Sequence, residues 1–158
     1  GHLGVLGTQA SVRGGAYERL VGELNSDLRV TSRACPLLVP LVEEGWLDHE
    51  VTDAVLREYL MPMLERGVDT LVLGCTHYPL LKESIARVTG PEVALVDSAE
   101  TCAAFVQREL QWHHLLATEG EGSVRIHVTD EMERVSEMAG RFLGGPSNAV
   151  QQVELGAL

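Results

Sequence analysis

The feature that most constrains the fold of this 158-residue chain is a regular alternation of short apolar runs with amphipathic helical patterns. Strands are expected at residues 3–7, 28–31, 69–74, 93–96 and 124–128, with helices in the intervals between them. The run at 69–74 is apolar on both faces, as in a strand of a parallel sheet. The alternation therefore predicts an α/β fold, a three-layer sandwich with a mostly parallel sheet.

Charge and cysteine content limit the classes of partner and cofactor. Twelve Lys and Arg against 23 Asp and Glu give a net charge of −11, which opposes phosphate binding, so no nucleic-acid partner is expected. No apolar run reaches the roughly 18–20 residues of a membrane span, so we expect no membrane association and a cytoplasmic protein. The three cysteines form neither a disulfide framework nor a CxxC motif, and His49, His113, His114 and His127 have no ligand-like spacing with a cysteine or carboxylate. We therefore expect free thiols and no metal.

The segment Gly74–Pro79 carries the sharpest chemical signal. It places Cys75 directly after an expected strand, where open α/β sheets bind their ligands. A following helix start and the imidazole of His77 would favour the thiolate, which is the reactive form. Thr76 offers a hydroxyl and a backbone N–H to an anionic group. An inert buried thiol, a packing histidine and a capping threonine fit the same residues, so the spacing alone leaves both interpretations open.

Polar groups in two other segments are candidates for the same edge of the sheet. Thr8 and Ser11 follow the first expected strand and could bind a carboxylate or phosphate, although on their own they fit a capping turn better. Glu43 follows a proline-bearing apolar loop and could orient a histidine, although a solvated carboxylate is the alternative. Cys35 and Cys102 lie in apolar patterns, so both are expected in the core.

Three segments in this order, Gly7–Ser11, Ala34–Gly45 and Leu73–Leu81, make the chain resemble the glutamate racemases of the Asp/Glu racemase superfamily. The resemblance runs from about Leu3 to Phe142. It implies two similar α/β domains that face each other, with glutamate between them and no cofactor. One cysteine from each domain then acts on opposite faces of the α-carbon, and the D-glutamate produced serves peptidoglycan synthesis.

The resemblance also implies roles for individual residues. Cys75 becomes one of the two catalytic cysteines, His77 assists it, and Glu43 is the acidic residue near the histidine. Thr76, together with His77, binds the substrate, and Thr8 and Ser11 hold its carboxylate. The related aspartate racemases tend to carry glutamate after the Cys-Thr pair, so His77 favours glutamate as the substrate.

Several family features are absent: an opening Asp-Ser-Gly strand end, a Pro-Tyr-Gly loop, and a first cysteine in an Asn-Thr context. We therefore expect the second half of a longer protein, inactive alone. The expected divisions are residues 3–96 as the α/β domain with the second catalytic cysteine, 97–144 as elements that would return to the missing first domain, and 145–158 as a flexible tail. Apolar faces left by the missing domain predict a homo-oligomer.

Three other functions remain open on the sequence. One is a non-catalytic α/β module for interaction or oligomerisation, and a second is another racemase of the superfamily, acting on aspartate. A third, a hydrolase using Cys75 and His77, lacks an evident acidic third member apart from Glu43.

Overall fold

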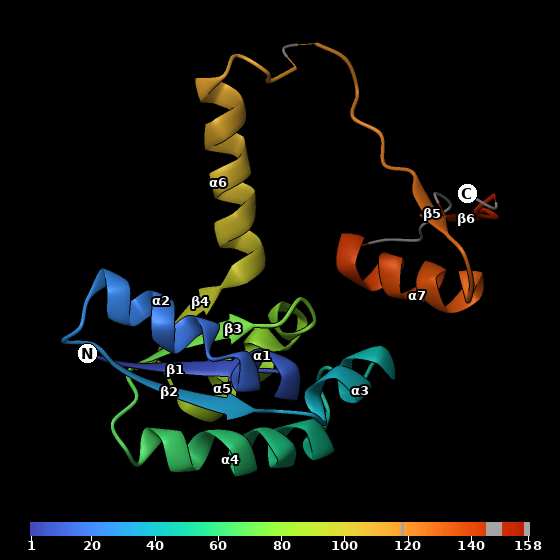
Figure 1. Cartoon of the computed structure of the whole chain (residues 1–158). Helices are drawn as coiled ribbons and strands as arrows, with labels where there is room; N and C mark the ends of the chain where they lie inside the picture. The colour runs from blue at the N-terminus through green and yellow to red at the C-terminus, as the bar shows by residue number, and fades with distance from the viewer. Residues whose placement is uncertain (118, 145–149, 157–158) are drawn as a thin grey trace. The chain divides into compact units, whose positions relative to one another are not determined.

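The computed structural model describes residues 1–117, 119–144 and 150–156, which fall into two units, Gly1–His114 and Leu115–Leu158 (Figure 1). This division lies after His114, whereas the sequence suggested one after residue 96. The long helix at 98–112 therefore belongs to the first unit. Among the described helices, none is long and apolar enough to cross a membrane.

The first unit is built on a four-stranded sheet in the order β2-β1-β3-β4, with every neighbouring pair parallel. The strands are β1 (His2–Gly7), β2 (Arg29–Ala34), β3 (Thr70–Gly74) and β4 (Ala94–Asp97). The central strands β1 and β3 contribute side chains that are fully buried, namely Val5, Leu6, Leu71 and Leu73. The parallel sheet expected from the sequence is confirmed.

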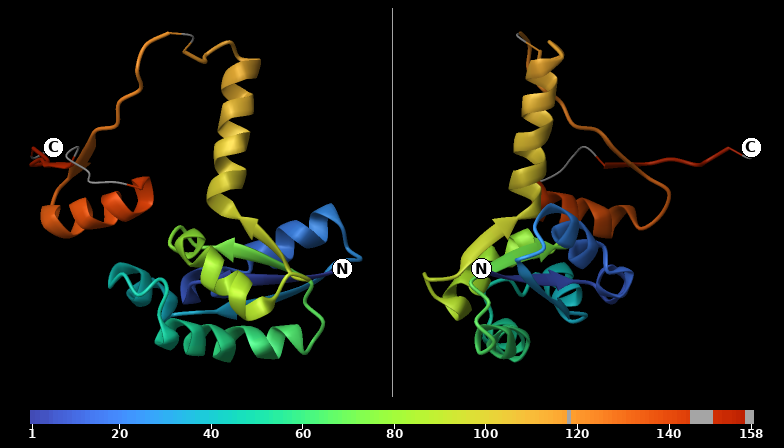
Figure 2. Two further views of the ribbon diagram at one scale, coloured as in Figure 1. Left: turned by 180° about the vertical axis from the view of Figure 1, so that it is seen from behind. Right: turned by 60° about the vertical axis from the view of Figure 1, so that its left-hand side comes forward.

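Helices cover both faces of this sheet. The helices of this unit are α1 (Gln9–Gly14), α2 (Ala16–Leu24), α3 (Leu38–Glu43), α4 (Glu50–Leu64), α5 (Lys82–Thr89) and α6 (Ser98–Trp112), with a 3-10 helix, η1 (Tyr78–Leu81), before α5. Figures 1 and 2 show α1 and α2 on one face, with α4 and α5 on the other. The three layers predicted from the alternation are therefore present, and most of the core lies between the sheet and α4.

Helix α6 differs from the expectation for its apolar stripe. Cys102 was expected in the core, but the helix has no buried residue, and Cys102 and Val106 are exposed. The physical reason is visible in Figure 2, where α6 leaves the end of β4 and extends away from the sheet of its own unit. The apolar stripe exists, but this unit offers no surface along its length.

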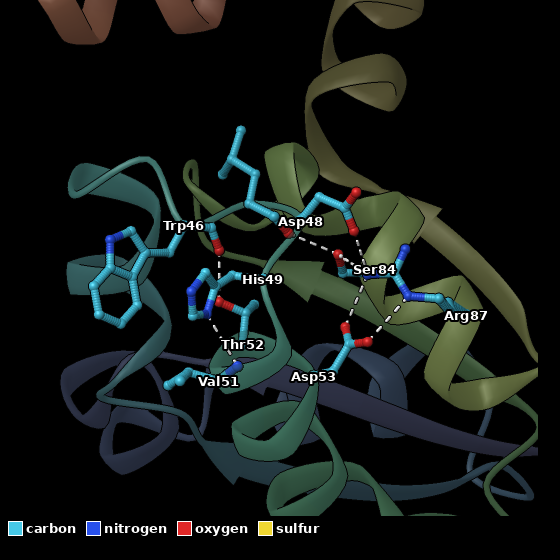
Figure 3. Close-up of polar contacts among 9 residues, drawn as sticks. Trp46, Asp48, His49, Val51, Thr52, Asp53, Ser84 and Arg87 are labelled. Carbon is cyan, nitrogen blue, oxygen red and sulfur yellow. Dashed lines mark hydrogen bonds and ion pairs between the residues drawn. The ribbon is translucent and has the colours of Figure 1, made fainter.

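The loop between α3 and α4 is held against α5 by side-chain hydrogen bonds (Figure 3). Ser84 donates its Oγ proton to the Leu47 carbonyl at 2.7 Å, and Arg87 donates to both carboxylate oxygens of Asp53 at 2.9 and 3.1 Å. These hydrogen bonds lower the pKa of Asp53 below its ordinary value. Helix α3 ends at Glu43, just before this loop.

The second unit contains β5 (Ile126–Val128), α7 (Met132–Leu143) and β6 (Val150–Gln152), and its two strands pair in parallel. The strand β6 lies within the residues for which a flexible tail was expected. Residues 145–149 and 157–158 of the expected tail lie outside the described part.

A pocket of about 320 Å³ lies between β5 and α7 in the second unit. Its lining is apolar and includes Ile126, Val135, Met138 and Phe142.

Candidate functional site

The register of the parallel strands brings three chain segments to one edge of the sheet. Gly7 of β1 pairs with Ala34 of β2 on one side and with Gly74 of β3 on the other. The residues that follow these positions, including Thr8 and Cys75, therefore emerge side by side at the carboxyl ends of the strands. This is the edge at which open parallel sheets bind ligands.

Thr8 and Ser11 form a hydroxyl pair at this edge. Thr8 is the N-cap of α1, and its Oγ1 accepts a hydrogen bond from the Ser11 backbone N–H at 3.2 Å. The two side-chain oxygens lie 3.0 Å apart. The capping interpretation is thus correct. Both side chains are only partly buried, so their remaining hydrogen-bonding capacity can serve a ligand.

The Cys75 segment is a turn that joins β3 to η1. Cys75 is half-buried, and its carbonyl accepts a hydrogen bond from the Tyr78 backbone N–H at 3.2 Å, which closes the turn. The sequence suggested that a helix starts directly after Cys75. The structure instead places the 3-10 helix at Tyr78 and the α-helix at Lys82. A dipole from the start of α5 therefore acts on this thiol less strongly than expected, because the effect is confined to the first turn.

The imidazole of His77 lies between two polar side chains. Its Nε2 is 3.4 Å from Oε1 of Glu43, and its Nδ1 is 3.3 Å from Oγ1 of Thr76. About a quarter of the His77 and Glu43 side chains is exposed, at 22% and 27%. The structure thus connects the end of α3 with the Cys75 turn through this imidazole. Such an arrangement can hold a histidine in one orientation while leaving it open to solvent and substrate.

The other two thiols lie in contrasting environments. Cys35 is fully buried, and burial raises the pKa of its thiol from 9.0 to about 12, so it is neutral at physiological pH. Its Sγ donates to the Arg33 carbonyl at 3.5 Å. The expectation of a core position is correct for Cys35 but wrong for Cys102, which is exposed on α6. Cys35 follows β2 at the same strand edge but is fully buried, so Cys75 is the partly exposed thiol at that edge.

One contributor to this edge was not identified from the sequence. Tyr78 is fully buried, and its hydroxyl contacts the ends of both β1 and β2. A sequence signal existed, since this tyrosine directly follows His77, but nothing in the pattern indicated its partners.

Within the described residues, no group of three or more His, Cys, Asp or Glu side chains is arranged to hold a metal ion.

Comparison with known proteins identifies relatives over almost the whole chain. The Asp/Glu/Hydantoin racemase family matches residues 1–106. A glutamate racemase from Geobacter metallireducens is 47% identical over 158 residues, covering 99% of this chain and 58% of the relative. The chain thus spans little more than half the length of the curated relatives that it matches.

Solved structures are similar to the chain as well. Glutamate racemase isoform RacE1 from Bacillus anthracis has a TM-score of 0.88 at 34% identity, covering 98% of this chain and 57% of that one. Glutamate racemase from Francisella tularensis, solved in complex with D-glutamate, has a TM-score of 0.87 at 30% identity, covering 98% and 58%. The α/β architecture described above is therefore shared with these enzymes.

Proposed function

The chain belongs to the Asp/Glu/Hydantoin racemase family, and from this premise we propose that it supplies the Cys75 side of a glutamate racemase site that works without a cofactor. One observation carries the proposal: the β1–β3 register places Cys75 and its neighbour His77 at the same sheet edge as Thr8. The edge thus combines a thiol, an imidazole and hydroxyl donors, which are groups suited to proton transfer at an amino acid.

In the proposed reaction, the Cys75 thiolate removes the α-proton of one glutamate enantiomer, and the C–H electrons remain on carbon as a carbanion-like species. A thiol on the opposite face then donates a proton and yields the other enantiomer. His77 exchanges a proton with Cys75 between turnovers, and Glu43 keeps the imidazole oriented through the 3.4 Å contact. Cys35 is unsuited to either thiol role because it is buried and neutral.

The substrate is held by hydroxyl groups in this proposal. Thr8 and Ser11, whose oxygens lie 3.0 Å apart, bind the carboxylate next to the α-carbon, and Thr76 contributes its hydroxyl from the Cys75 turn. Glutamate is favoured over aspartate for two reasons. His77 occupies the position after Cys-Thr that resembles glutamate racemases, and the relatives described above carry that name.

We further propose a cytoplasmic setting, in which D-glutamate serves peptidoglycan synthesis, and self-association of the chain. Self-association is supported by exposed apolar side chains on α6, with Phe105 at 52% and Trp112 at 80% exposure. The apolar pocket of the second unit is a separate surface of the same character. Exposed apolar side chains that lie together are typical of interaction sites.

The decisive experiment measures exchange of the α-hydrogen with solvent. Purified protein is incubated in heavy water with L-glutamate, D-glutamate, L-aspartate or D-aspartate, and deuterium at the α-carbon is followed by mass spectrometry together with optical rotation. Because one thiol reaches one face only, we expect slow exchange of a single glutamate enantiomer without racemisation. Cys75→Ala abolishes this exchange, whereas Cys102→Ala leaves it unchanged.

Other outcomes would redirect the proposal. Faster exchange of aspartate than of glutamate would assign the chain to the other substrate. Full racemisation by this chain, lost in Cys75→Ala, would show that the second base lies within these 158 residues. Exchange that survives Cys75→Ala would remove Cys75 from the mechanism.

A further inference from the structure

The buried phenol of Tyr78 links the segments that form the candidate site. Its hydroxyl donates toward two backbone carbonyl oxygens, of Gly7 at 3.2 Å and of Cys35 at 3.0 Å. A hydroxyl has one proton, so this proton is shared between the ends of two neighbouring strands. The backbone N–H of the same residue donates to the Cys75 carbonyl at 3.2 Å. Tyr78 is thereby bonded to all three segments.

Each of these bonds lies next to a residue with a proposed role. The Gly7 carbonyl belongs to the peptide bond that leads into Thr8. The Cys35 carbonyl lies at the start of the segment that continues through α3 to Glu43. The last residue pairs of both strand ladders are at Gly7, opposite Ala34 and Gly74. The hydrogen bonds of the Tyr78 hydroxyl therefore link the strand ends just after the last paired residues.

We propose that Tyr78 is a positioning residue for Cys75, whose hydroxyl holds the Cys75–His77 turn at a fixed place relative to the ends of β1 and β2. The inference rests on the proposed role of Cys75 as the reacting thiol. Tyr78 itself does not reach a substrate, because its side chain is fully buried and its hydroxyl is engaged with backbone. It acts only through the segments that it ties together.

The electrostatic environment keeps this hydroxyl a donor. Burial raises the pKa of Tyr78 above its ordinary value, and the nearby Cys35 and Cys75 thiols act in the same direction. A protonated phenol can donate to a carbonyl and a phenolate cannot, so the raised pKa preserves this donor at neutral pH. Phenylalanine fills the same space without the proton, so Tyr78→Phe removes the tie and little else.

The test compares alkylation rates of two cysteines within one folded protein. Iodoacetamide labelling of Cys75 and Cys102 is followed by peptide mass mapping, with Cys102 as the internal reference because it is exposed on α6. In Tyr78→Phe we expect the Cys75 rate to rise about threefold or more relative to Cys102, because the turn opens more often. Replacement of Tyr78 by 4-aminophenylalanine restores an N–H donor and should return the ratio toward that of the unaltered protein.

A matched control removes a different tyrosine hydroxyl. Tyr59 is also buried, at 8% exposure, but it lies on α4, where its ring faces the Arg33 guanidinium. Tyr59→Phe should leave the Cys75 to Cys102 ratio unchanged. An unchanged ratio in Tyr78→Phe would overturn the positioning role. So would unfolding of Tyr78→Phe as a whole, since the hydroxyl would then support the entire unit rather than the turn.

The labelling readout also separates this inference from the proposed function. It needs no substrate, so it reports on Tyr78 even if the chain exchanges no glutamate α-hydrogen. If exchange is observed, Tyr78→Phe should lower its maximal rate, because the turn that carries Cys75 is held less firmly. Absence of exchange in the unaltered protein, with the labelling change present, would contradict exchange by this chain alone and would leave the positioning role of Tyr78 standing.

Discussion

The imidazole Nε2 of His77 lies 3.4 Å from the Glu43 carboxylate, although the two residues come from the turn after β3 and the end of α3. The contact is an ion pair when His77 is protonated, and it fixes which edge of the ring faces the protein. Because both side chains are partly exposed, its value lies in orientation more than in stability. It joins the loop anchored on α5 to the segment that carries Cys75.

Glu43→Gln tests this orientation. We expect α-hydrogen exchange of glutamate to fall about tenfold, because a neutral amide holds the imidazole less firmly for proton transfer. The free energy of unfolding should change by less than about 1 kcal/mol, as for other partly exposed pairs. Glu44→Gln is the matched control, since Glu44 is the exposed neighbour. An equal loss in both variants would argue for a general charge effect.

Gly74→Ala should disturb the strand end that presents Cys75. A Cβ at this position would lie 2.8 Å from the Leu6 carbonyl oxygen and 3.0 Å from the Tyr17 hydroxyl, so backbone must move. We expect a loss of about 1–3 kcal/mol in the free energy of unfolding, measured in urea.

Gly22→Ala is the contrasting variant. No atom lies within 4 Å of the added Cβ, and the residue is inside α2. Stability should rise by up to about 1 kcal/mol, because alanine favours the helix. A stabilising Gly74→Ala would refute the close packing between β3 and β1.

Removal of the Asp97 carboxylate should destabilise the start of α6. Its Oδ1 accepts hydrogen bonds from the backbone N–H groups of Ala99 at 2.8 Å and Glu100 at 3.2 Å. Asp97→Ala should cost about 1–2 kcal/mol, as for loss of other N-caps. Asp97→Asn keeps a capping oxygen, and the smaller loss expected there measures the charge interaction with Lys82, whose Nζ lies 3.5 Å away. Equal losses in the two variants would mean that the cap itself contributes nothing.

Stability should fall in alkaline solution because of Cys35. Burial raises the pKa of its thiol from 9.0 to about 12, so the folded state retains a proton that the unfolded state releases. The contribution is complete below pH 9 and is lost as the pH rises from there toward 12. Urea midpoints across that window check this, and Cys35→Ala should flatten the decline. The pKa of Tyr78 is also raised in the folded state, so its titration lowers the stability in the same direction. Part of the decline will therefore remain in Cys35→Ala.

Self-association should follow from the exposed apolar side chains of α6. Sedimentation at increasing concentration should show dimers or larger species, and Phe105→Ser with Trp112→Ser should shift the distribution toward monomer. The matched control is Leu24→Ser on α2, which is 86% exposed and lies on another helix. A monomer at every concentration, with no binding of an apolar dye, would contradict this prediction.

The sequence by itself determined the layered parallel fold and the placement of its chemistry at strand ends. Apolar runs such as Leu71 to Leu73 specify buried strands, and the helical stripes between them require parallel crossovers. Parallel strands end at a common edge, so Thr8 and Cys75 were brought together by topology alone. Helix α6 is capped by Asp97, the last residue of β4, because the strand continues one position further than its apolar run.

Only the tertiary structure decided which side chains meet and which apolar faces are covered. The Glu43–His77 contact and the shared proton of Tyr78 join segments far apart in the chain, and no local pattern encodes such distances. The stripe that includes Cys102 shows the same limit. The spacing of these residues predicts that one face of α6 is apolar. Burial of that face requires a second surface, and the first unit provides none.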